Sequence, residues 1–243
     1  MVGRIITTLD CVAEGADWLA RAEPRFAHAL TLVGPLPLRR QPDGFTALLD
    51  AIVGQQVSVA SADAIWRRME AAGLTDRATL AMASDEACRA VGLSRQKARY
   101  GRALADSAID FDALRGLPDA QVVEVLTDVP GIGMWTAEIY AMFALGRADV
   151  FAPGDLALQE GARLLFDLSE RPKDRALRAM AEAWSPWRAV AGERRHGDAV
   201  GQPDVAGLCG VEQGRHGRFR KWRGGCDSVP LSGGGQGGSE LRR

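Results

Sequence analysis

The stretch Val129–Glu138, which reads VPGIGMWTAE, decides the fold of this 243-residue chain. Pro130 ends the preceding helix, the glycines Gly131 and Gly133 permit backbone angles that are closed to other residues, and the next helix can begin near Gly133. Two helices are therefore joined by a tight hairpin. The backbone N–H groups at the start of the second helix can hold an anion such as a nucleic-acid phosphate. An ordinary helix connection, with glycines for geometry alone, remains open at this point.

Two segments of the chain, one far upstream of the hairpin and one directly after it, carry apolar residues at helical spacing. The pattern places them on one buried face of each segment, at Phe45, Leu48, Leu49, Ile52 and Val53 and again at Trp135, Ile139, Met142 and Phe143. No convincing alternating strand or repeat occurs, which predicts an all-α fold. The chain has an ordinary composition, with 47% hydrophobic and 25% charged residues and a formal charge of −1. Any binding of nucleic acid must therefore be local rather than a bulk charge effect.

Four ordered stretches carry a family resemblance. The first is LTDVPGIGMWTAEIYAMFALGRADVFAPGDLALQEG (Leu126–Gly161), and the others are GFTALLDAIVGQQVSVASA (Gly44–Ala62), VGLSRQKARYGRALA (Val91–Ala105) and AEAWSPWRAVA (Ala181–Ala191). Together they resemble the helix-hairpin-helix superfamily of DNA glycosylases, and within it the DNA-3-methyladenine glycosylase II branch. The resemblance implies two helical lobes around a DNA-binding cleft. It also implies an enzyme of base-excision repair that hydrolyses the N-glycosidic bond of alkylated purines such as 3-methyladenine.

The resemblance further implies that Asp155, downstream of the hairpin, is catalytic. An aspartate directly before a helical segment is most often an N-cap, and the two roles can coexist. The helix dipole keeps a carboxylate ionised at that position. Glycosidic cleavage passes through an oxocarbenium-like state, whose positive charge a fixed anion stabilises. Asp155 would supply that charge and could also orient or deprotonate the attacking water.

Trp135 follows the second hairpin glycine, where superfamily members that also nick DNA carry a nucleophilic lysine. An indole cannot form a Schiff base, so the resemblance implies a monofunctional enzyme that leaves an abasic site. In this branch the aromatic residue lines the base pocket and stacks on a positively charged alkylated purine, and Tyr140 would assist from the same helix. A core tryptophan is the structural alternative. Glu138 is expected to be an exposed helical glutamate rather than a second polar group near the cleft.

The DNA-binding residues that the resemblance implies fall into three groups. The hairpin grips the DNA backbone, the loop after Gly54 is the wedge that fills the gap left by a flipped base, and GLSRQKARYGRA starts a helix that makes a second phosphate contact. In that order, the groups are Pro130, Gly131, Ile132, Gly133 and Thr136; Gln55, Gln56 and Ser58; and Gly92, Ser94 and Lys97. Polar residues at a helix junction are the alternative for Gln55 and Gln56, and a solvated basic residue is the alternative for Lys97.

The expected partner is double-stranded DNA containing alkylated bases, bound by a monomer in the cytoplasm. The four cysteines stand singly, and Cys209 and Cys226 are too few and too far apart for the iron–sulfur cluster of some superfamily members. No cofactor or metal is therefore expected, apart from a monovalent cation that the resemblance places at the hairpin carbonyls. No run of 18 or more apolar residues occurs, so a membrane partner is not expected.

The chain divides into four segments. Residues 1–40 form an N-terminal helical segment that packs on the second lobe, and residues 41–145 form the central helical lobe, which ends in the helix-hairpin-helix at about 121–145. Residues 146–191 belong to the catalytic lobe. Fourteen of the 28 glycines lie in residues 192–243, where the family's aromatic-rich helix is missing. We expect this tail to be disordered or translated out of frame, so the alternative function is a non-catalytic DNA-binding protein or an inactivated glycosylase.

Overall fold

The computed structural model describes residues 2–192 and consists almost entirely of helices and their connections. Within these residues no strand occurs, and the extended backbone pairs only at an isolated antiparallel bridge between Ile5 and Arg147. The all-α prediction is confirmed. Across the described residues no helix is long and apolar enough to cross a membrane. The predictions made for residues 193–243, including those for Cys209 and Cys226, lie outside the described residues.

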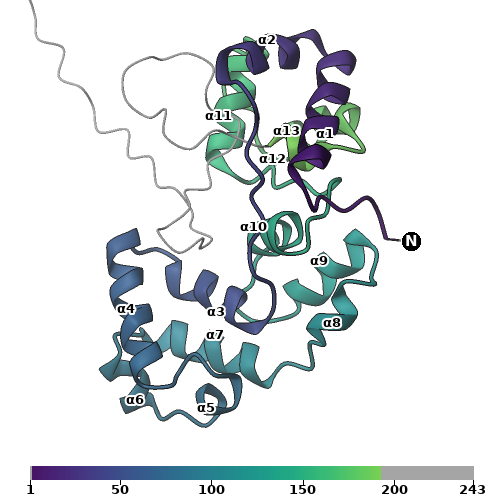
Figure 1. Cartoon of the computed structure of the whole chain (residues 1–243). Helices are drawn as coiled ribbons and strands as arrows, with labels where there is room; N and C mark the ends of the chain where they lie inside the picture. Colours follow the sequence, from purple (N-terminus) through teal and green to yellow (C-terminus); the bar gives the residue numbers. More distant parts are fainter. Residues whose placement is uncertain (1, 193–243) are drawn as a thin grey trace, which may run out of the picture.

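Helices between residues 45 and 127 form one lobe, which we call the middle lobe (Figure 1, lower half). They are α3 (Phe45–Gly54), α4 (Val59–Ala71), α5 (Arg77–Ala81), α6 (Asp85–Ala90), α7 (Arg95–Asp106), α8 (Phe111–Leu114) and α9 (Asp119–Thr127). Helix α7 contacts α3, α5 and α6. The lobe is held together by fully buried apolar side chains, including Leu48, Leu49, Met69, Leu80 and Leu104.

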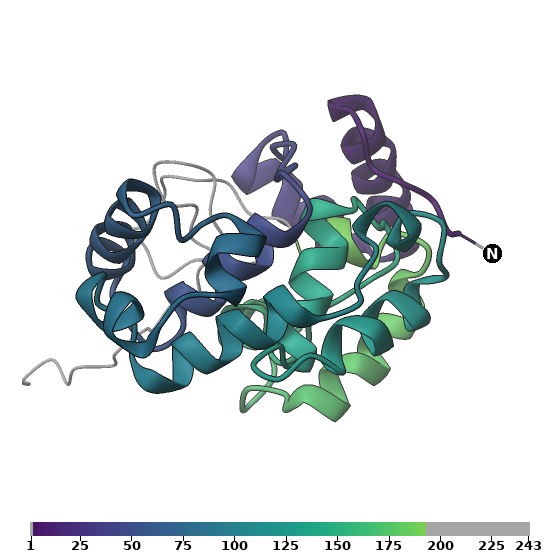
Figure 2. The same cartoon turned by 90° about the horizontal axis from the view of Figure 1, so that it is seen from below.

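The two ends of the described chain form the other lobe, which we call the terminal lobe. It contains α1 (Leu9–Ala22), α2 (Pro24–Val33), α11 (Leu156–Leu165), α12 (Asp174–Ala181), the 3-10 turn η2 (Glu182–Trp184) and α13 (Arg188–Ala191). Helix α1 contacts α2, α13 and η2, and α2 contacts α11. Figure 2 shows the first helices (purple) on the same side of the molecule as the last described ones (green), with the blue helices of the middle lobe on the other side.

An aromatic cluster lies in the core of the terminal lobe. Trp184 meets Phe26 and Phe151 edge-on, with ring centroids 5.5 Å apart in both pairs, and stacks on Phe166 at 5.8 Å. Such pairs contribute about 0.5–1.5 kcal/mol each beyond the burial of their area. The cluster therefore joins η2 to α2, to the end of α11 and to the segment that precedes Asp155.

Helix α10 (Met134–Ile139) and the π-helical turn η1 (Tyr140–Ala144) lie between the two lobes (Figure 1). Every residue from Thr136 to Ala148 is buried. A helix that is covered on all sides is a core helix rather than an amphipathic surface helix. Both lobes therefore share this segment as part of their core.

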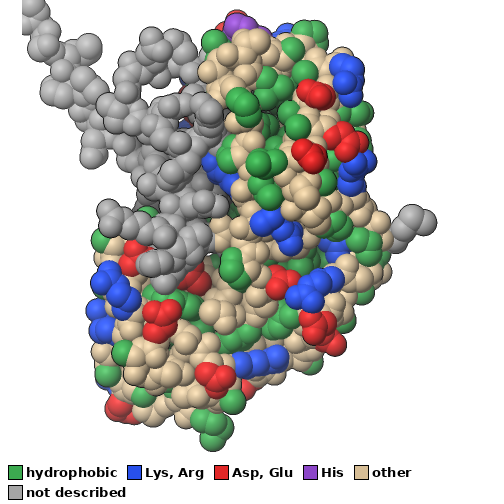
Figure 3. All heavy atoms as spheres, in the orientation of Figure 1, with side chains coloured by type: hydrophobic (Ala, Val, Ile, Leu, Met, Phe, Trp, Pro, Cys, Tyr) green, Lys and Arg blue, Asp and Glu red, His purple; other side chains and the backbone are tan. Residues whose placement is uncertain are grey.

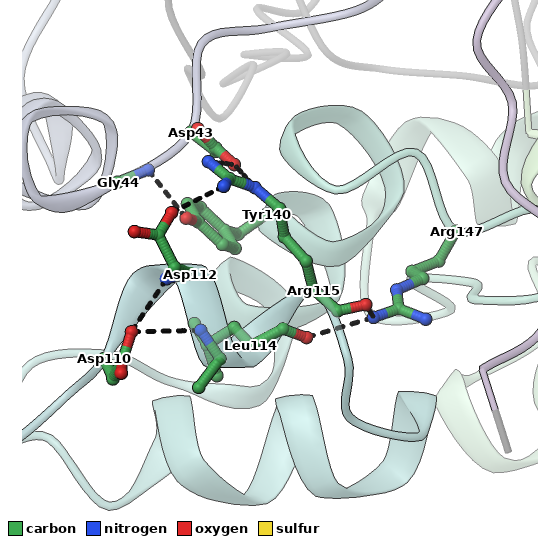
Figure 4. A network of polar contacts seen from close by, with 9 residues as sticks. Asp43, Gly44, Asp110, Asp112, Leu114, Arg115, Tyr140 and Arg147 are labelled. Carbon is green, nitrogen blue, oxygen red and sulfur yellow. Dashed lines mark hydrogen bonds and ion pairs between the residues drawn. The ribbon is translucent and has the colours of Figure 1, made fainter.

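A polar network fixes the linker between α2 and α3, which joins the two lobes, to the segment formed by α10 and η1 (Figure 4). The N–H of Gly44 donates a 2.7 Å hydrogen bond to the hydroxyl of Tyr140, and Arg115 pairs with Asp43 at 2.8 Å. Arg147 is fully buried and donates to two carbonyls at the C-terminal end of α8, at 3.0 Å each. A cation is favoured there because the helix dipole makes this end negative.

The face of the molecule in Figure 3 carries Lys and Arg side chains interspersed with Asp and Glu, rather than one continuous basic area. This agrees with the formal charge of −1 for the whole chain. Affinity for a polyanion must then come from a small number of groups in defined positions, such as the backbone N–H groups of the hairpin.

Candidate active site

The hairpin between α9 and α10 uses its two glycines differently. Gly131 has a φ of +97°, and a Cβ added there would lie 2.4 Å from the ring of Tyr100. The backbone conformation and the close packing of that ring both require glycine. Gly133 has a φ of −88°, and an added Cβ would meet nothing within 4 Å. The expectation that both glycines adopt backbone angles closed to other residues is wrong for Gly133, whose missing side chain instead leaves the start of α10 open.

The first turn of α10 is open to an anion. Gly133 is the N-cap residue, and no side chain caps the helix there. Pro130 and Gly133 are exposed, whereas Ile132 and Thr136 are buried. Backbone N–H groups at a helix N-terminus carry the positive end of the dipole. A phosphate would therefore meet the backbone at and after Gly133, and the contacts predicted for the buried Ile132 and Thr136 stay predictions.

Asp155 has one of the two roles considered for it, that of an N-cap. It is the N-cap of α11, where its Oδ1 accepts hydrogen bonds from the backbone N–H groups of Ala157 at 2.9 Å and Leu158 at 3.3 Å. The residue is only 3% exposed, so its carboxylate lies out of bulk water. The N–H donors and the helix dipole together compensate the burial of the charge. The N-cap role of Asp155 is thus present in the structure, and it is compatible with a catalytic role.

Trp135 supplies a third donor to this carboxylate. Its indole Nε1 donates a 3.0 Å hydrogen bond to Oδ2 of Asp155, across twenty residues of sequence. Both carboxylate oxygens are therefore held, which fixes the anion in one orientation. Neither the base-pocket role nor the core alternative for Trp135 included this contact. No sequence signal indicates it, because it depends on how the start of α10 packs against the start of α11.

The structure does not bring the other two candidates on this helix to Asp155. Tyr140 is 1% exposed with its hydroxyl bound to Gly44, and burial raises the pKa of this phenol to about 12, which supports a structural role rather than one in a base pocket. Glu138 is 3% exposed, not exposed as expected, and pairs with Arg178 at 2.8 Å. Burial raises the pKa of this carboxyl to about 7, against the opposing effect of Arg178. Both differences arise because the two lobes cover the segment from Thr136 to Ala148 on all sides.

The predicted wedge is the loop between α3 and α4. Gln56 is exposed and has a φ of +57°, in the left-handed region that non-glycine residues rarely adopt. Gln55 has a different environment, since its Nε2 donates a 2.8 Å hydrogen bond to the carbonyl of Gly131 in the hairpin. Ser58 caps α4 by accepting from the N–H of Ser61. Gln56 thus stays a predicted wedge, whereas Gln55 and Ser58 have intramolecular partners.

The second predicted phosphate contact lies at the start of α7. Gly92 has a φ of +92°, and Ser94 caps the helix by accepting from the N–H of Lys97 at 3.2 Å. The ammonium group of Lys97, however, donates a 2.7 Å hydrogen bond to the carbonyl of Val53 near the C-terminal end of α3. A cation is favourable at that end of a helix, so Lys97 is not a fully solvated residue, and its phosphate contact stays a prediction. Gly92 and Ser94 are exposed and stay predicted contacts.

Comparison with known proteins agrees with this geometry. Residues 49–188 match the family described as HhH-GPD superfamily base excision DNA repair protein. This match covers more than half of the chain, and the chain belongs to that family. The superfamily recognised from the four sequence stretches is therefore confirmed.

Two similar solved structures share the fold, and a curated relative has related sequence. A DNA-3-methyladenine glycosidase from Bacillus halodurans is 34% identical, with 77% of this chain and 88% of that chain covered and a TM-score of 0.67. The 3-methyladenine DNA glycosylase of Schizosaccharomyces pombe, in complex with abasic DNA, is 25% identical, with 73% and 92% covered and a TM-score of 0.62. The Escherichia coli DNA-3-methyladenine glycosylase 2 is 29% identical over an aligned length of 163 residues, with 61% of this chain covered.

Coverage of the curated relatives varies. The match spans 55% of the Escherichia coli protein, and 41% of a Bacillus subtilis relative that is 29% identical over 117 residues. It spans 81% of the DNA-3-methyladenine glycosylase 1 of Schizosaccharomyces pombe, at 25% identity. The chain thus corresponds to about half the length of some relatives and to most of the length of others.

Alanine at each hairpin glycine should separate folding from DNA binding. Gly131→Ala should lower the free energy of unfolding by about 1–3 kcal/mol, because a left-handed residue then carries a Cβ against Tyr100. Gly133→Ala should leave the melting temperature unchanged and weaken binding to a duplex oligonucleotide by about tenfold, because the Cβ blocks the approach of a phosphate. Thermal melts and fluorescence anisotropy with labelled DNA measure the two effects. Unchanged DNA affinity in Gly133→Ala would contradict the proposed use of the open helix start.

Glu138→Gln tests the buried carboxyl through pH. The folded-state pKa of about 7 lies above the ordinary value of 4.5, so the folded protein binds this proton more tightly and loses stability as pH rises between the two values. Glutamine keeps an acceptor for Arg178 without the charge. The variant's melting temperature should equal that of the wild type near about pH 5 and exceed it near about pH 8.

A matched control is Glu160→Gln, which removes a more exposed carboxylate paired with Arg163 at 2.7 Å. Hydrogen bonding from Arg163 lowers the pKa of Glu160, so this variant should show no gain in melting temperature at alkaline pH. If both variants respond to pH in the same way, the raised pKa of Glu138 is not the cause.

Proposed function

We propose that this chain is a monofunctional DNA glycosylase that hydrolyses the N-glycosidic bond of alkylated purines of the 3-methyladenine type and leaves an abasic site. The observation that carries the proposal is the buried carboxylate of Asp155, which three N–H donors hold beside a helix-hairpin-helix. Membership of a base-excision repair family and similarity to 3-methyladenine glycosylases support the reaction class.

The chemistry follows from the charge of Asp155. Positive charge develops on the deoxyribose as the glycosidic bond lengthens, and an anion already fixed in a water-poor site stabilises it without reorganisation. The two carboxylate oxygens have about four lone-pair sites, and three of them accept the N–H groups described above. The remaining capacity can accept a proton from the attacking water. Asp155 therefore stabilises the transition state and orients or deprotonates the nucleophile.

Trp135 supports this reaction in two ways. Its N–H donates to Oδ2 of Asp155 and so keeps the carboxylate in one orientation relative to the bound sugar. The indole has no amine with which to attack the sugar, so the abasic product is released without strand cleavage. The face of the ring would stack on an alkylated purine, whose positive charge is attracted by the ring's electrons.

The proposed partner is duplex DNA, bound by a monomer. The open start of α10 after Gly133 takes one backbone phosphate, and the exposed capped start of α7 at Ser94 takes another. Gln56, at the exposed apex of its loop, enters the gap left by the flipped base and hydrogen-bonds the orphaned partner base. The proposed location is the cytoplasm, whose reducing conditions would keep Cys11 and Cys88 as thiols.

No cofactor takes part in the proposed reaction, and carbonyl groups of the hairpin backbone would hold a monovalent cation. The carbonyl of Val129 accepts the N–H of Ile132 at 3.0 Å, and that of Gly131 accepts from Gln55. Each carbonyl oxygen has a second lone pair, which is the ligand that a hard cation prefers. A bound cation would supply positive charge beside a DNA phosphate.

A second candidate function is DNA binding without catalysis. The change of composition after Ala191 favours it, because the family's aromatic-rich helix is missing from the sequence there. The buried Asp155 favours the enzyme, because the bond from Trp135 to its Oδ2 is more than an N-cap requires. Base release from alkylated DNA separates the two candidates directly.

Asp155→Asn should abolish most of the base release. Asparagine keeps the size of the side chain but removes the charge, and loss of one preorganised group of this kind typically slows a reaction by about 10²-fold or more. Single-turnover excision from methylated duplex DNA measures the rate, and anisotropy measures the affinity, which should not fall. Near-wild-type excision by Asp155→Asn would refute the assignment.

The chain offers a matched control for this substitution. Asp110 is the N-cap of α8, and its Oδ1 accepts from the N–H groups of Asp112 and Ala113 at 3.0 Å each. Asp110→Asn therefore removes the same charge from the same kind of cap, away from the site. It should lower stability by about 1 kcal/mol at most and leave the excision rate unchanged.

Trp135→Phe should slow excision by about tenfold with little change in DNA affinity. Phenylalanine keeps a ring for stacking but cannot donate to Asp155, and a hydrogen bond to a charged group contributes about 1.5–3 kcal/mol. Trp66→Phe is the control, because the indole of Trp66 donates to Glu70 at 2.8 Å outside the site. Wild type and both variants should produce no strand breaks until alkali is added. Breaks formed by the wild type without alkali would contradict the monofunctional reaction.

A further inference from the structure

Three elements meet at Gly131, the first glycine of the hairpin. Its carbonyl accepts the 2.8 Å hydrogen bond from Nε2 of Gln55, which belongs to the loop between α3 and α4. Its Cα lies against the ring of Tyr100 on α7, so closely that an added Cβ would be 2.4 Å from that ring. The hairpin is thus held on one side by the predicted wedge loop and on the other by α7.

Helix α7 also holds the wedge loop itself. Lys97 donates its 2.7 Å hydrogen bond to the carbonyl of Val53, two residues before Gln55. Lys97 and Tyr100 are three residues apart on α7 and therefore lie on the same side of that helix. One side of α7 thus contacts both elements, the start of the wedge loop through Lys97 and the hairpin through Tyr100. Gln55 joins the wedge loop directly to the hairpin.

The residue after Gln55 is the exposed Gln56. Its φ of +57° turns the chain sharply. The side chain of Gln55 and the apex of the loop at Gln56 therefore have different orientations. Ser58 then starts α4 as its N-cap. The exposed apex of the loop therefore lies between two residues with partners in the protein. On the α3 side this residue is Gln55, which is bound to the hairpin, and on the α4 side it is Ser58.

We propose that Gln55 is a positioning residue that joins the wedge loop to the hairpin as one rigid unit. On this basis, a phosphate bound at the hairpin fixes where Gln56 enters the duplex, and Gln55 itself contacts protein rather than DNA. The role rests on the proposed function, because it concerns base displacement by a glycosylase. It goes beyond that function because it couples two DNA contacts that were assigned separately.

The consequence for DNA is a division between affinity and base displacement. The hairpin N–H groups and Ser94 bind phosphates whether or not the wedge loop is joined to them, so loss of the Gln55 bond should leave duplex affinity nearly unchanged. Insertion of Gln56 requires a defined distance between loop and phosphate, and a small misplacement of groups in a site costs rate rather than binding. A residue that contacts DNA directly would show the opposite pattern.

The first experiment uses Gln55→Met, which keeps the length of the side chain and removes the donor. A duplex with 2-aminopurine beside an abasic-site analogue reports base displacement by fluorescence, without any excision. At saturating protein we expect the fluorescence change and the single-turnover excision rate to fall by about fivefold, since a neutral hydrogen bond changes an equilibrium by roughly 2- to 13-fold. The dissociation constant for the duplex should change by less than about twofold.

The second experiment uses pH and the isosteric variant Gln55→Glu. An ionised glutamate cannot donate to the Gly131 carbonyl, whereas a protonated one can, so the displacement signal relative to wild type should recover as pH falls from about 7 to about 4, below the ordinary pKa of a glutamate. Gln55→Met has no titrating group and should show no recovery. Gln121→Met is the control, because it makes the same change of side chain at an exposed position on α9. Its signal should equal that of the wild type.

The outcomes distinguish this inference from the proposed function. If the wild type displaces the base but releases none from alkylated DNA, the proposed function fails, and the variants still test the inference. An unchanged displacement signal in Gln55→Met, or a loss confined to affinity, overturns the positioning role. A Gln55→Glu signal that does not exceed that of Gln55→Met at low pH overturns it as well.

Discussion

The burial of α10 between the two lobes is the constraint on which the rest of the structure depends. Every residue from Thr136 to Ala148 is buried, so each side of this segment must be satisfied by a neighbour. Trp135 meets Asp155 at its start, Glu138 pairs with Arg178 of the terminal lobe, and Tyr140 binds the linker at Gly44. A single helix thus places the hairpin, the carboxylate and the linker relative to one another.

The same groups serve the fold and the proposed chemistry. Asp155 caps α11 through the N–H groups of Ala157 and Leu158, and that capping makes a buried charge tolerable. Trp135 belongs partly to the core and also holds Oδ2 of the carboxylate. The hydrogen bonds that stabilise the fold also hold the carboxylate in place, so no further groups are needed to keep it in a site away from water. For the same reason, an N-cap aspartate and a catalytic aspartate look alike in sequence.

The sequence allowed the large features to be predicted. Helical periodicity and the absence of alternating strands led to the all-α class, which is confirmed. The Pro-Gly-x-Gly pattern located the hairpin between α9 and α10, with the second helix starting after Gly133. Predictions for single side chains were harder to make. Glu138 was expected to be exposed because charged groups usually face water, and the resemblance assigned Tyr140 to the base pocket and Lys97 to a phosphate contact. In this fold all three have partners within the protein.

Local patterns in the sequence by themselves determined where helices begin, where they turn and which aspartate stands before a helix. These properties depend on backbone angles, capping and periodicity, which act over a few residues. Tertiary structure alone decided that Gly131 is needed against Tyr100 while Gly133 stays open, and that Trp135 reaches Asp155. It also decided that Gln55 binds the hairpin rather than solvent. Such contacts join residues of distant segments, and their distances are set by how helices pack.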